Sequence, residues 1–473
     1  MVRLLLLSLL ILCSASASGA ATLAASQSPG LVGQAGSSDA AEPVDRPDII
    51  VVMVDDLGYI PDDRLLRRLP SINEFWLRDG LRFTQAYNEI PVCCPARANF
   101  QSGQHSLRNG VIVNDWAGFD TSVTIATAID AAGYHTLFVG KYLNGYRGSV
   151  VPPGWDRAFI TMGSPPRLRD PQFWQDGQLM EYEGMFYDDV VRAKAVRWLR
   201  QAPLDEPVFE MVAPYAPHRY RLNCGRAGRL TCKMRPAVMR RDRGAPECAS
   251  IPDFKPPSYS TTADFKAAVA RVPGTWDEGW PLVTSCESLL VVDRMVGQLI
   301  EAQADRGRPA YFVFMSDNGM AWGQHGHPLK YVPWATRLPF YVSGPDIDAG
   351  RTNARISIID IPVTLAELAG TSLPAADGDS FLPTLRGEPG DGRPEILEML
   401  PPPPEGWREE YVGWAAIRTG SWRYIRWENG HLELYDLRSD PWELVNVAVD
   451  EPAIVMDLEA RLDRLIEESA GPT

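Results

Sequence analysis

Short apolar runs recur along this chain and alternate with longer amphipathic segments. Residues 48–54 form a continuous run rich in β-branched side chains, which is typical of a strand buried on both faces of a parallel sheet. Similar runs follow at residues 136–139, 208–212, 311–315 and 340–342. Helical periodicity occupies residues 123–132, 187–200 and 287–303, between those runs. This alternation predicts an α/β fold with helices on both faces of one sheet.

The pattern changes near residue 411. Aromatic and apolar residues alternate with polar ones at residues 414–418, 422–427 and 431–435, and turn signals separate the three runs. We therefore expect antiparallel strands here, followed by an amphipathic helix at residues 453–468. The proline run at residues 401–404 is the natural linker. The sequence thus predicts a main domain at residues 47–400 and a C-terminal α+β subdomain at residues 405–473.

The amino-terminal end has the pattern of an export signal. Arg3 precedes an apolar run at residues 4–12, and small residues follow it. A bilayer crossing takes about 20 residues, so this run is too short to span a membrane. We expect a signal peptide at residues 1–25, a flexible leader rich in Ala, Gly and Ser at residues 26–46, and a secreted or extracytoplasmic protein without a membrane span.

Net charge and cysteine content limit the partners that the protein can bind and the pairing of its cysteines. A net charge of -14 argues against nucleic acid as the main partner, because a phosphate backbone is bound by clustered cations. Export would place the cysteines in an oxidising compartment. Cys224, Cys232 and Cys248 share one Arg-rich segment, where a Cys224–Cys232 disulfide is one pairing and free thiols are the alternative. The spacing does not fix the pairing.

Acidic and amide side chains follow two of the predicted strands. Asp55 and Asp56 end the first run, and Asp317 and Asn318 end the fourth. In an open α/β sheet ligands bind beyond the carboxyl ends of the strands. Four oxygen ligands suit Ca²⁺, or with less preference Mg²⁺, better than zinc. The alternative is that these are ordinary turn and capping residues.

Cys93 begins a predicted helix. Pro95, two residues later, fits the first turn, which places Cys93 at the amino end, where unpaired amides and the helix dipole stabilise anions. Arg97 would lie near the same end. The alternatives are two buried thiols at Cys93 and Cys94, or a disulfide.

The run from Cys93 to Arg97 resembles the formylglycine signature of the sulfatases of the alkaline phosphatase superfamily. Further motifs occur in the order found in that family, and the resemblance covers residues 48–447. They are Asp55-Asp56, Gly140-Lys141-Tyr142-Leu143-Asn144, Ala213-Pro214-Tyr215-Ala216-Pro217-His218, the segment from Asp317 to Lys330, and Leu434-Tyr435-Asp436-Leu437. Cys93-Cys94-Pro95 and Gly140-Lys141-Tyr142-Leu143-Asn144 together look most like the N-acetylglucosamine-6-sulfatase branch, whose substrates are sulfated glycosaminoglycans.

The resemblance implies a fold, a modification and a metal. The fold would be an alkaline-phosphatase-like mixed, mostly parallel sheet sandwiched by helices, with a smaller C-terminal antiparallel sheet plus helix. Cys93 would be oxidised by a formylglycine-generating enzyme to formylglycine (3-oxoalanine), whose hydrate attacks the sulfur of a sulfate ester. One Ca²⁺ would be held by Asp55, Asp56, Asp317 and Asn318 together with the modified Cys93.

It also implies roles for the remaining site residues. Lys141, Lys330 and Arg97 would neutralise the sulfate oxygens, and His218 would contact sulfate or protonate the departing sugar oxygen. Asn144 and His325 would contact the substrate, a sulfated saccharide. Leu143 stands where many sulfatases carry a His, which leaves the proton acceptor for sulfate elimination open. Two rival functions are a phosphomonoester or phosphonate hydrolase on this scaffold, and a carbohydrate-binding protein in which Cys93 stays unmodified.

Overall fold

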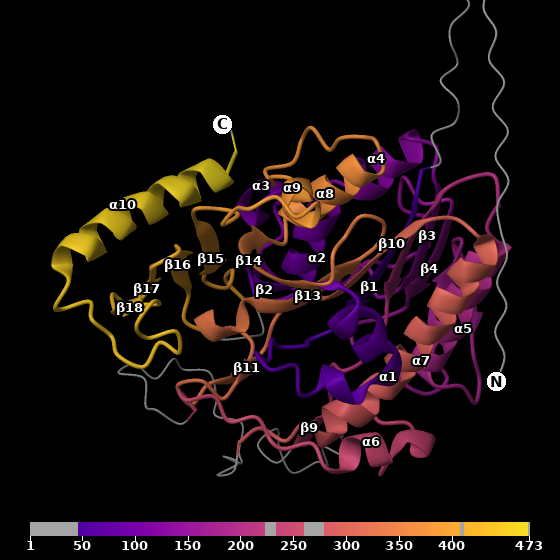
Figure 1. The fold of residues 1–473 in the computed structure, drawn as a ribbon, viewed down its shortest axis with the longest axis horizontal. Coiled ribbons are helices and arrows are strands. Elements are labelled where there is room, and N and C mark those ends of the chain that lie inside the picture. Colours follow the sequence, from indigo (N-terminus) through magenta and orange to yellow (C-terminus); the bar gives the residue numbers. More distant parts are fainter. Residues whose placement is uncertain (1–45, 223–232, 260–278, 407–410, 472–473) are drawn as a thin grey trace, which may run out of the picture. The chain divides into compact units, whose positions relative to one another are not determined.

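A ten-stranded sheet forms the centre of the computed structural model, which describes residues 46–222, 233–259, 279–406 and 411–471 (Figure 1). Strands β10, β1, β7, β3 and β4 run parallel in its middle, and β13 and β5 run opposite to them. In spatial order the strands are β14 (Gly350–Ser357), β2 (Leu81–Tyr87), β13 (Arg337–Ser343), β10 (Ala310–Ser316), β1 (Asp48–Val54), β7 (Val208–Ala213), β3 (His135–Gly140), β4 (Arg157–Thr161), β5 (Gln172–Gln175) and β6 (Gln178–Glu181).

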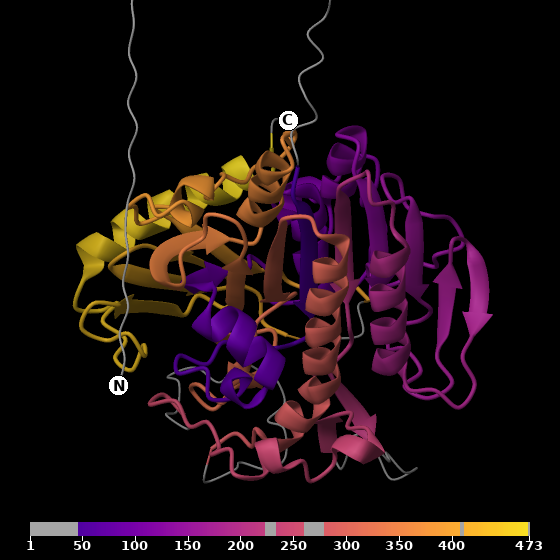
Figure 2. The same ribbon diagram turned by 45° about the vertical axis from the view of Figure 1, so that its right-hand side comes forward.

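Helices cover both faces of this sheet. On one face α5 (Tyr187–Gln201) and α7 (Val283–Arg306) lie side by side, as Figure 2 shows, together with the short α1 (Pro70–Ile72). The other face packs against α2 (Cys93–Ser102), α4 (Ile125–Ala131) and α8 (Asp360–Leu368). Alternate residues of β1 face opposite layers: Ile50 belongs to the α5 and α7 core and Ile49 to the α2 core. Every residue of β1 is buried, which explains its continuous apolar run.

A second, antiparallel sheet of four strands follows the main one. It consists of β15 (Ile396–Leu400), β16 (Trp414–Arg418), β17 (Trp422–Trp427) and β18 (Leu432–Asp436), and α10 (Pro452–Ser469) packs on it. Its core also includes Ile90, Val92, Val332 and Trp334, which come from loops next to the main sheet. The small sheet is therefore anchored to those loops through a shared apolar core.

Shorter elements complete the described fold. Two hairpins pair β8 with β9 and β11 with β12, a π-helical segment at Asn73–Arg78 follows α1, and the remaining helices are single turns. These elements are α3 (Ser106–Asn109), β8 (Arg219–Leu222), β9 (Lys233–Pro236), α6 (Pro246–Ala249), β11 (Ala321–Trp322), β12 (Pro328–Leu329), α9 (Leu382–Leu385), and 3₁₀ turns at Leu66–Arg68, Arg240–Asp242 and Pro333–Ala335.

The fold class agrees with the sequence prediction, and two local differences are informative. The four-stranded sheet begins at Ile396, ahead of the proline run that was expected to precede it. Residues 45–473 form one compact unit that holds both sheets, so the division near residue 400 remains a prediction. The predicted signal peptide lies outside the described residues, as do residues 26–45 of the leader. No helix in the described part of the chain is long and apolar enough to cross a membrane.

One disulfide joins two helices. Cys248 of α6 is bonded to Cys286 of α7, with their Cα atoms 5.7 Å apart. The sequence left the pairing of Cys248 open, and its partner in the structure lies 38 residues further along the chain. The suggested Cys224–Cys232 pair lies outside the described residues. Cys93 and Cys94 are free and buried, so a disulfide at Cys93 is excluded in this structure.

Glu210 on β7 is a buried acidic residue, and its protonation should make the stability of the protein depend on pH. Its side chain is fully buried, neither carboxyl oxygen has a hydrogen-bond partner within the described residues, and Leu137 and Ile50 flank it on the neighbouring strands. Burial raises the pKa of Glu210 well above its ordinary value, and Arg306 offsets only part of this. The folded chain thus keeps a proton that the unfolded chain releases above about pH 4.5. Stability should therefore fall as pH rises.

We expect Glu210→Gln to remove this pH dependence. The free energy of unfolding of the unmodified chain should fall above pH 4.5 by up to about 1.4 kcal/mol per pH unit from this group, and the variant should lack that contribution. Urea unfolding at pH 5 and pH 7.5 measures the difference. Exposed Glu206→Gln is the matched control. Parallel pH profiles for both variants and the unmodified chain would contradict the prediction.

Candidate active site

Two neighbouring parallel strands deliver the acidic residues. Val54 at the end of β1 pairs with Ser316 at the end of β10, so Asp55 and Asp317 leave the sheet side by side. The Asp317 amide donates to the Val54 carbonyl oxygen at 2.9 Å, which continues the ladder beyond the strands. Asp55 and Asp317 are fully buried. Strand register alone therefore brings together the two sequence segments that were predicted to share a site.

Short hydrogen bonds fix the acidic side chains. Asp317 Oδ1 accepts from the backbone amides of Asp56 at 3.1 Å and Asn318 at 2.7 Å. Asn318 Nδ2 donates to Asp56 Oδ1 at 2.9 Å and to the Gly319 carbonyl oxygen at 2.8 Å. Asp56 adopts a left-handed backbone conformation, with φ at 62°, as Asp tolerates better than most residues. The chain bends sharply at this point, and the Asp56 carboxylate faces Asn318.

Cys93 is the first residue of α2 and meets the same carboxylates. Its Sγ lies 3.5 Å from Asp55 Oδ1, 3.7 Å from Asp56 Oδ1 and 2.8 Å from Lys330 Nζ. Burial raises the pKa of the Cys93 thiol well above its ordinary value, and Asp55 raises it further. An unmodified Cys93 therefore stays protonated, and a protonated thiol is a poor nucleophile.

Arg97 and Lys141 neutralise the buried acids from the other side. Arg97 lies one turn along α2, and its Nε donates to Asp317 Oδ2 at 2.9 Å while its Nη2 lies 3.5 Å from Asp55 Oδ2. Lys141 follows β3, and its Nζ pairs with Asp55 Oδ2. Burial raises the pKa of Asp55, but Lys141, His218 and Arg97 together outweigh this and hold it below its ordinary range. The helix and the third strand thus both supply cations to one acidic pair.

Lys330 supplies the third cation. Its Nζ contacts Asp56 Oδ1 as well as Cys93 Sγ, and the Asp56 carboxylate raises the pKa of Lys330 well above its ordinary value although burial acts to lower it. The loop after Lys330 is held by the C-terminal sheet and the segment that follows it. The contacts are Trp414 Nε1 to the Tyr331 carbonyl oxygen at 3.2 Å, Arg423 Nη2 to the Pro333 carbonyl oxygen at 2.6 Å, and Trp334 Nε1 to Glu443 Oε2 at 2.9 Å.

His218 follows β7 and is the last of the residues that meet at this site. Its Nδ1 lies 2.9 Å from the Arg219 carbonyl oxygen, an acceptor, so Nδ1 carries the proton in the neutral ring. Its Nε2 lies 3.3 Å from Asp56 Oδ2 and 4.0 Å from Asp55 Oδ1. Burial lowers the pKa of His218, although both Asp residues raise it, so the neutral ring with a lone pair facing the acids is favoured. This is the form that can bind a metal or accept a proton.

We call these residues the strand-end cluster. It combines three carboxylates, three cations, an amide, an imidazole and a thiol, and the structure brings them all together within the core of the molecule. Its members are Asp55, Asp56, Cys93, Arg97, Lys141, His218, Asp317, Asn318 and Lys330.

The donor atoms of the cluster fit a hard divalent cation. Ligand atoms of Asp55, Asp56, Cys93 and His218 all lie within 4.8 Å of one another. Asn318 Oδ1 is buried and has no hydrogen-bond partner within the described residues, which leaves it available as an oxygen ligand. Proximity adds His218 to the predicted ligand set, and nothing in the sequence pattern indicated that role. Asp317 is instead engaged by Arg97 and two backbone amides.

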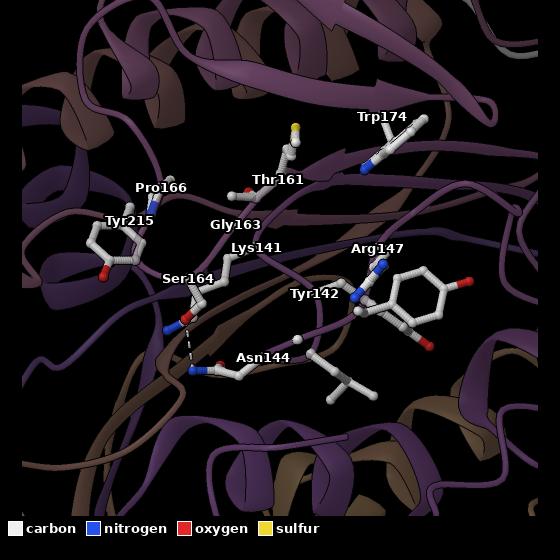
Figure 3. Close-up of a pocket in the computed structure, with 14 residues that line it drawn as sticks. Lys141, Tyr142, Asn144, Arg147, Thr161, Gly163, Ser164, Pro166, Trp174 and Tyr215 are labelled. Carbon is white, nitrogen blue, oxygen red and sulfur yellow. Dashed lines mark hydrogen bonds between the residues drawn. The ribbon is translucent and has the colours of Figure 1, made fainter. Parts of the chain in front are cut away.

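A cavity of about 380 Å³ adjoins the cluster (Figure 3). Lys141 and Tyr215 line it, and the Tyr215 ring lies 4.4 Å from that of His218. Asn144 also lines it, and its Nδ2 donates to Ser164 Oγ at 3.1 Å. Leu143 also lines the cavity, although most of its side chain is buried in the α2 core. Asn144 therefore reaches the space next to Lys141, as a substrate contact would.

His325 is neither a member of the strand-end cluster nor among the residues that line the cavity. Its ring stacks on Trp334 at 4.2 Å and lies 6.2 Å from Tyr435 of the small sheet, and its backbone amide donates to the Ser258 carbonyl oxygen. Burial lowers the pKa of His325 to about 4, so the ring is neutral near pH 7. These contacts place His325 against the C-terminal sheet, behind the loop that carries Lys330. The substrate contact predicted for His325 stays a prediction without support from this geometry.

Comparison with known proteins places this geometry in a family. A family model described as Sulfatase matches residues 47–371. The match covers more than half of the chain and includes every member of the strand-end cluster. The chain belongs to the sulfatase family. The predicted family is thus confirmed, and this sulfatase is a sulfuric ester hydrolase.

Relatives and solved structures agree with the assignment. Arylsulfatase K of Homo sapiens is 26% identical over 459 residues, which cover 89% of this chain and 82% of that protein. N-acetylglucosamine-6-sulfatase of Capra hircus is 25% identical over 508 residues, covering 93% and 86%. A protein solved in complex with its substrate D-glucosamine-2-N,6-O-disulfate superposes with a TM-score of 0.71 at 20% identity, covering 90% of this sulfatase and 98% of that chain, which confirms the predicted fold.

We expect Ca²⁺ to stabilise this sulfatase through the strand-end cluster. After removal of metals with a chelator, added Ca²⁺ should raise the melting temperature, because a ligand at about 100 times its dissociation constant stabilises by about 2.7 kcal/mol. Asn318→Ala should lose most of this gain, since it removes the buried oxygen. Differential scanning calorimetry with Ca²⁺ and with Mg²⁺ measures both effects. Exposed Asp62→Asn is the control, and an equal gain in Asn318→Ala would refute the site.

Proposed function

We propose that this sulfatase removes sulfate from a sulfated sugar of the glycosaminoglycan type, with a nucleophile derived from Cys93. The position of Cys93 carries the proposal. It begins α2, where the backbone amides and helix dipole favour an anion, and it touches two carboxylates and one ammonium group of the strand-end cluster. The relative named N-acetylglucosamine-6-sulfatase supports an amino sugar as the sulfated residue.

Two groups beyond the polypeptide complete the proposal. Formylglycine at Cys93, formed by a formylglycine-generating enzyme, would supply a hydrated aldehyde as nucleophile in place of the protonated thiol. A divalent cation, which we propose to be Ca²⁺, would be held by Asp55, Asp56, Asn318 and Cys93, with Asp317 or His218 beside them, and would polarise a sulfate oxygen. The oxygen-rich donor set supports Ca²⁺ or Mg²⁺ over zinc.

The cations of the cluster bind and orient the sulfate. Lys141, after β3, pairs with Asp55, and Lys330, after β12, pairs with Asp56, so sulfate oxygens next to Cys93 would meet two ammonium groups. Arg97 is bound to Asp317 and Asp55, and its part is to hold those acids in place. Burial strengthens each of these electrostatic contacts, because little water screens them.

Proton transfer falls to the residues on the cavity side. His218 Nε2 faces the acids with its lone pair, so it can accept the proton of the second geminal hydroxyl during sulfate elimination and give it to the sugar oxygen that departs in the next turnover. Leu143 lines the same cavity, but its aliphatic side chain cannot accept a proton. We therefore assign to His218 the acceptor role that the sequence left open.

We also propose that the protein is exported. The apolar run at residues 4–12 and the small residues after it support a cleaved signal. The Cys248–Cys286 disulfide supports an oxidising compartment, because such bonds are rare where thiols are kept reduced.

We expect the peptide that contains Cys93 to carry an aldehyde at that position in protein from its native host. Mass spectrometry distinguishes this from a thiol, and an aldehyde-reactive hydrazide probe should label the same peptide. Cys94 provides an internal control, because it is the next residue and should remain a thiol. A thiol at Cys93 throughout active protein would exclude the formylglycine mechanism.

Activity should depend on Asp317. We expect 4-nitrophenyl sulfate to be hydrolysed faster than 4-nitrophenyl phosphate, and Asp317→Asn to lower kcat by at least about 100-fold, because Arg97 and two amides lose their anionic partner. Circular dichroism checks that the variant is folded. Asp305→Asn, an exposed change, is the control. Faster phosphate turnover would favour a phosphoesterase, and an unaffected Asp317→Asn would refute the role.

A further inference from the structure

The cavity beside the strand-end cluster has two ends of different character. Lys141 belongs to the strand-end cluster and lines the cavity together with Tyr215, and Arg147, Trp174 and Tyr146 also line it. In Figure 3 Arg147 and Trp174 lie on one side of the cavity, and Lys141, Ser164 and Tyr215 lie on the other. Its volume of about 380 Å³ is near the lower limit for small-molecule sites. The space suits one sugar residue with its substituents better than a long saccharide.

Arg147 is a cation for which the described part of the chain supplies no counter-charge. Its side chain is exposed, and it has no hydrogen bond or ion pair with any residue in the described ranges. Many other arginines in the same part of the chain are paired, for example Arg157 with Asp176 and Arg167 with Glu181. In a chain with a net charge of -14, an unpaired guanidinium that lines a cavity next to the reaction site is a specific local feature.

A buried polar atom points to a ligand in the same space. Asn144 is about nine-tenths buried, and its Oδ1 has no hydrogen-bond partner within the described residues, while its Nδ2 is engaged by Ser164. Figure 3 shows the Asn144 amide beside Ser164, on the same side of the cavity as Lys141. Because buried acceptors are normally hydrogen-bonded, Asn144 Oδ1 is suited to accept from a ligand donor such as a sugar hydroxyl or amide. The aromatic rings of Trp174 and Tyr146 offer flat apolar faces for a sugar ring.

We propose that this cavity holds the sugar that bears the scissile sulfate, and that Arg147 binds a second oxyanion on that sugar or on its neighbour. This rests on the proposed function. The scissile sulfate lies at the cluster end beside Lys141, and the second sulfate or carboxylate lies at the outer end, where the planar guanidinium can form two parallel hydrogen bonds to it. Arg147 is thus a specificity-determining residue that selects doubly anionic sugars over singly anionic ones.

The test compares matched substrates. The holoenzyme, with the aldehyde at Cys93 verified, is assayed on 4-nitrophenyl sulfate, on N-acetylglucosamine 6-sulfate, on glucosamine sulfated at both the nitrogen and O6, and on a disaccharide in which a uronate is linked to N-acetylglucosamine 6-sulfate. The second and third differ in a single anionic group, and the fourth presents a carboxylate instead of a sulfate. The variants are Arg147→Ala, Arg147→Lys and Arg167→Ala.

We expect the unmodified enzyme to prefer at least one doubly anionic substrate over N-acetylglucosamine 6-sulfate in kcat/KM. Arg147→Ala should lower that preference by roughly 10- to 100-fold, mainly through KM, because a charge-assisted hydrogen bond is lost. Arg147→Lys should restore part of it. Arg167→Ala removes an equal charge from outside the cavity lining and should leave the preference unchanged. If Arg147→Ala lowers the preference for the disulfated glucosamine, the second group is a sulfate. If it lowers the preference for the uronate disaccharide, the second group is a carboxylate.

The outcomes distinguish the proposed sugar subsite with Arg147 from the proposed sulfatase function. Turnover of the sulfate esters with an unchanged preference in Arg147→Ala would overturn the role of Arg147 and leave the sulfatase chemistry intact. Hydrolysis of the aryl sulfate alone would exclude a sugar subsite in this cavity. Failure to hydrolyse any sulfate ester, with the aldehyde present, would overturn the proposed function and the subsite with it. A preference lost equally in Arg167→Ala would show a general charge effect and also reject the subsite.

Discussion

The structure depends on the burial of three carboxylates at the ends of two adjacent strands. Asp55, Asp56 and Asp317 have almost no contact with solvent, and a buried charge without a partner costs several kcal/mol. Cations must therefore come to this point from elsewhere in the chain. Arg97 comes from the helix after β2, Lys141 from the end of β3 and Lys330 from the loop after β12. The need to compensate these charges ties distant segments into one site.

The need to place a cation beside the buried carboxylates also explains what the C-terminal sheet contributes to the site. Lys330 lies on a loop whose backbone would otherwise be free to move, and Arg423, Trp414 and Glu443 hold that loop through hydrogen bonds. Arg423 is itself buried and neutralised by Glu398 and Glu443. The small sheet thus positions the ammonium group that contacts Cys93, although it contributes no residue to the strand-end cluster. Its role in the site is to fix a loop rather than to touch substrate.

Sequence patterns predicted the buried middle of the fold well and its polar margins poorly. β1 and β10 were visible because strands covered on both faces are apolar throughout, and their parallel pairing follows from the fold class. β2 was missed because Arg82 and Thr84 interrupt its apolar pattern; Arg82 is buried through its pairing with Asp63, a partner that only the folded chain supplies. Asp55, Asp56, Asp317 and Asn318 were predictable because they follow strands, whereas the other members of the cluster were indicated by the resemblance to sulfatases. The cavity was not predictable, because it joins side chains from separate loops.

Charge balance links the cluster to its substrate. Its three carboxylates and three cations cancel, so the site without metal has little net charge of its own. A divalent cation held by the acids would leave the cluster positive, and an anionic sulfate ester would restore neutrality. Each should therefore strengthen the binding of the other, as linkage requires. In an acidic chain that otherwise repels anions, attraction for the substrate is then created locally, by the bound cation at the cluster and by the unpaired guanidinium across the cavity.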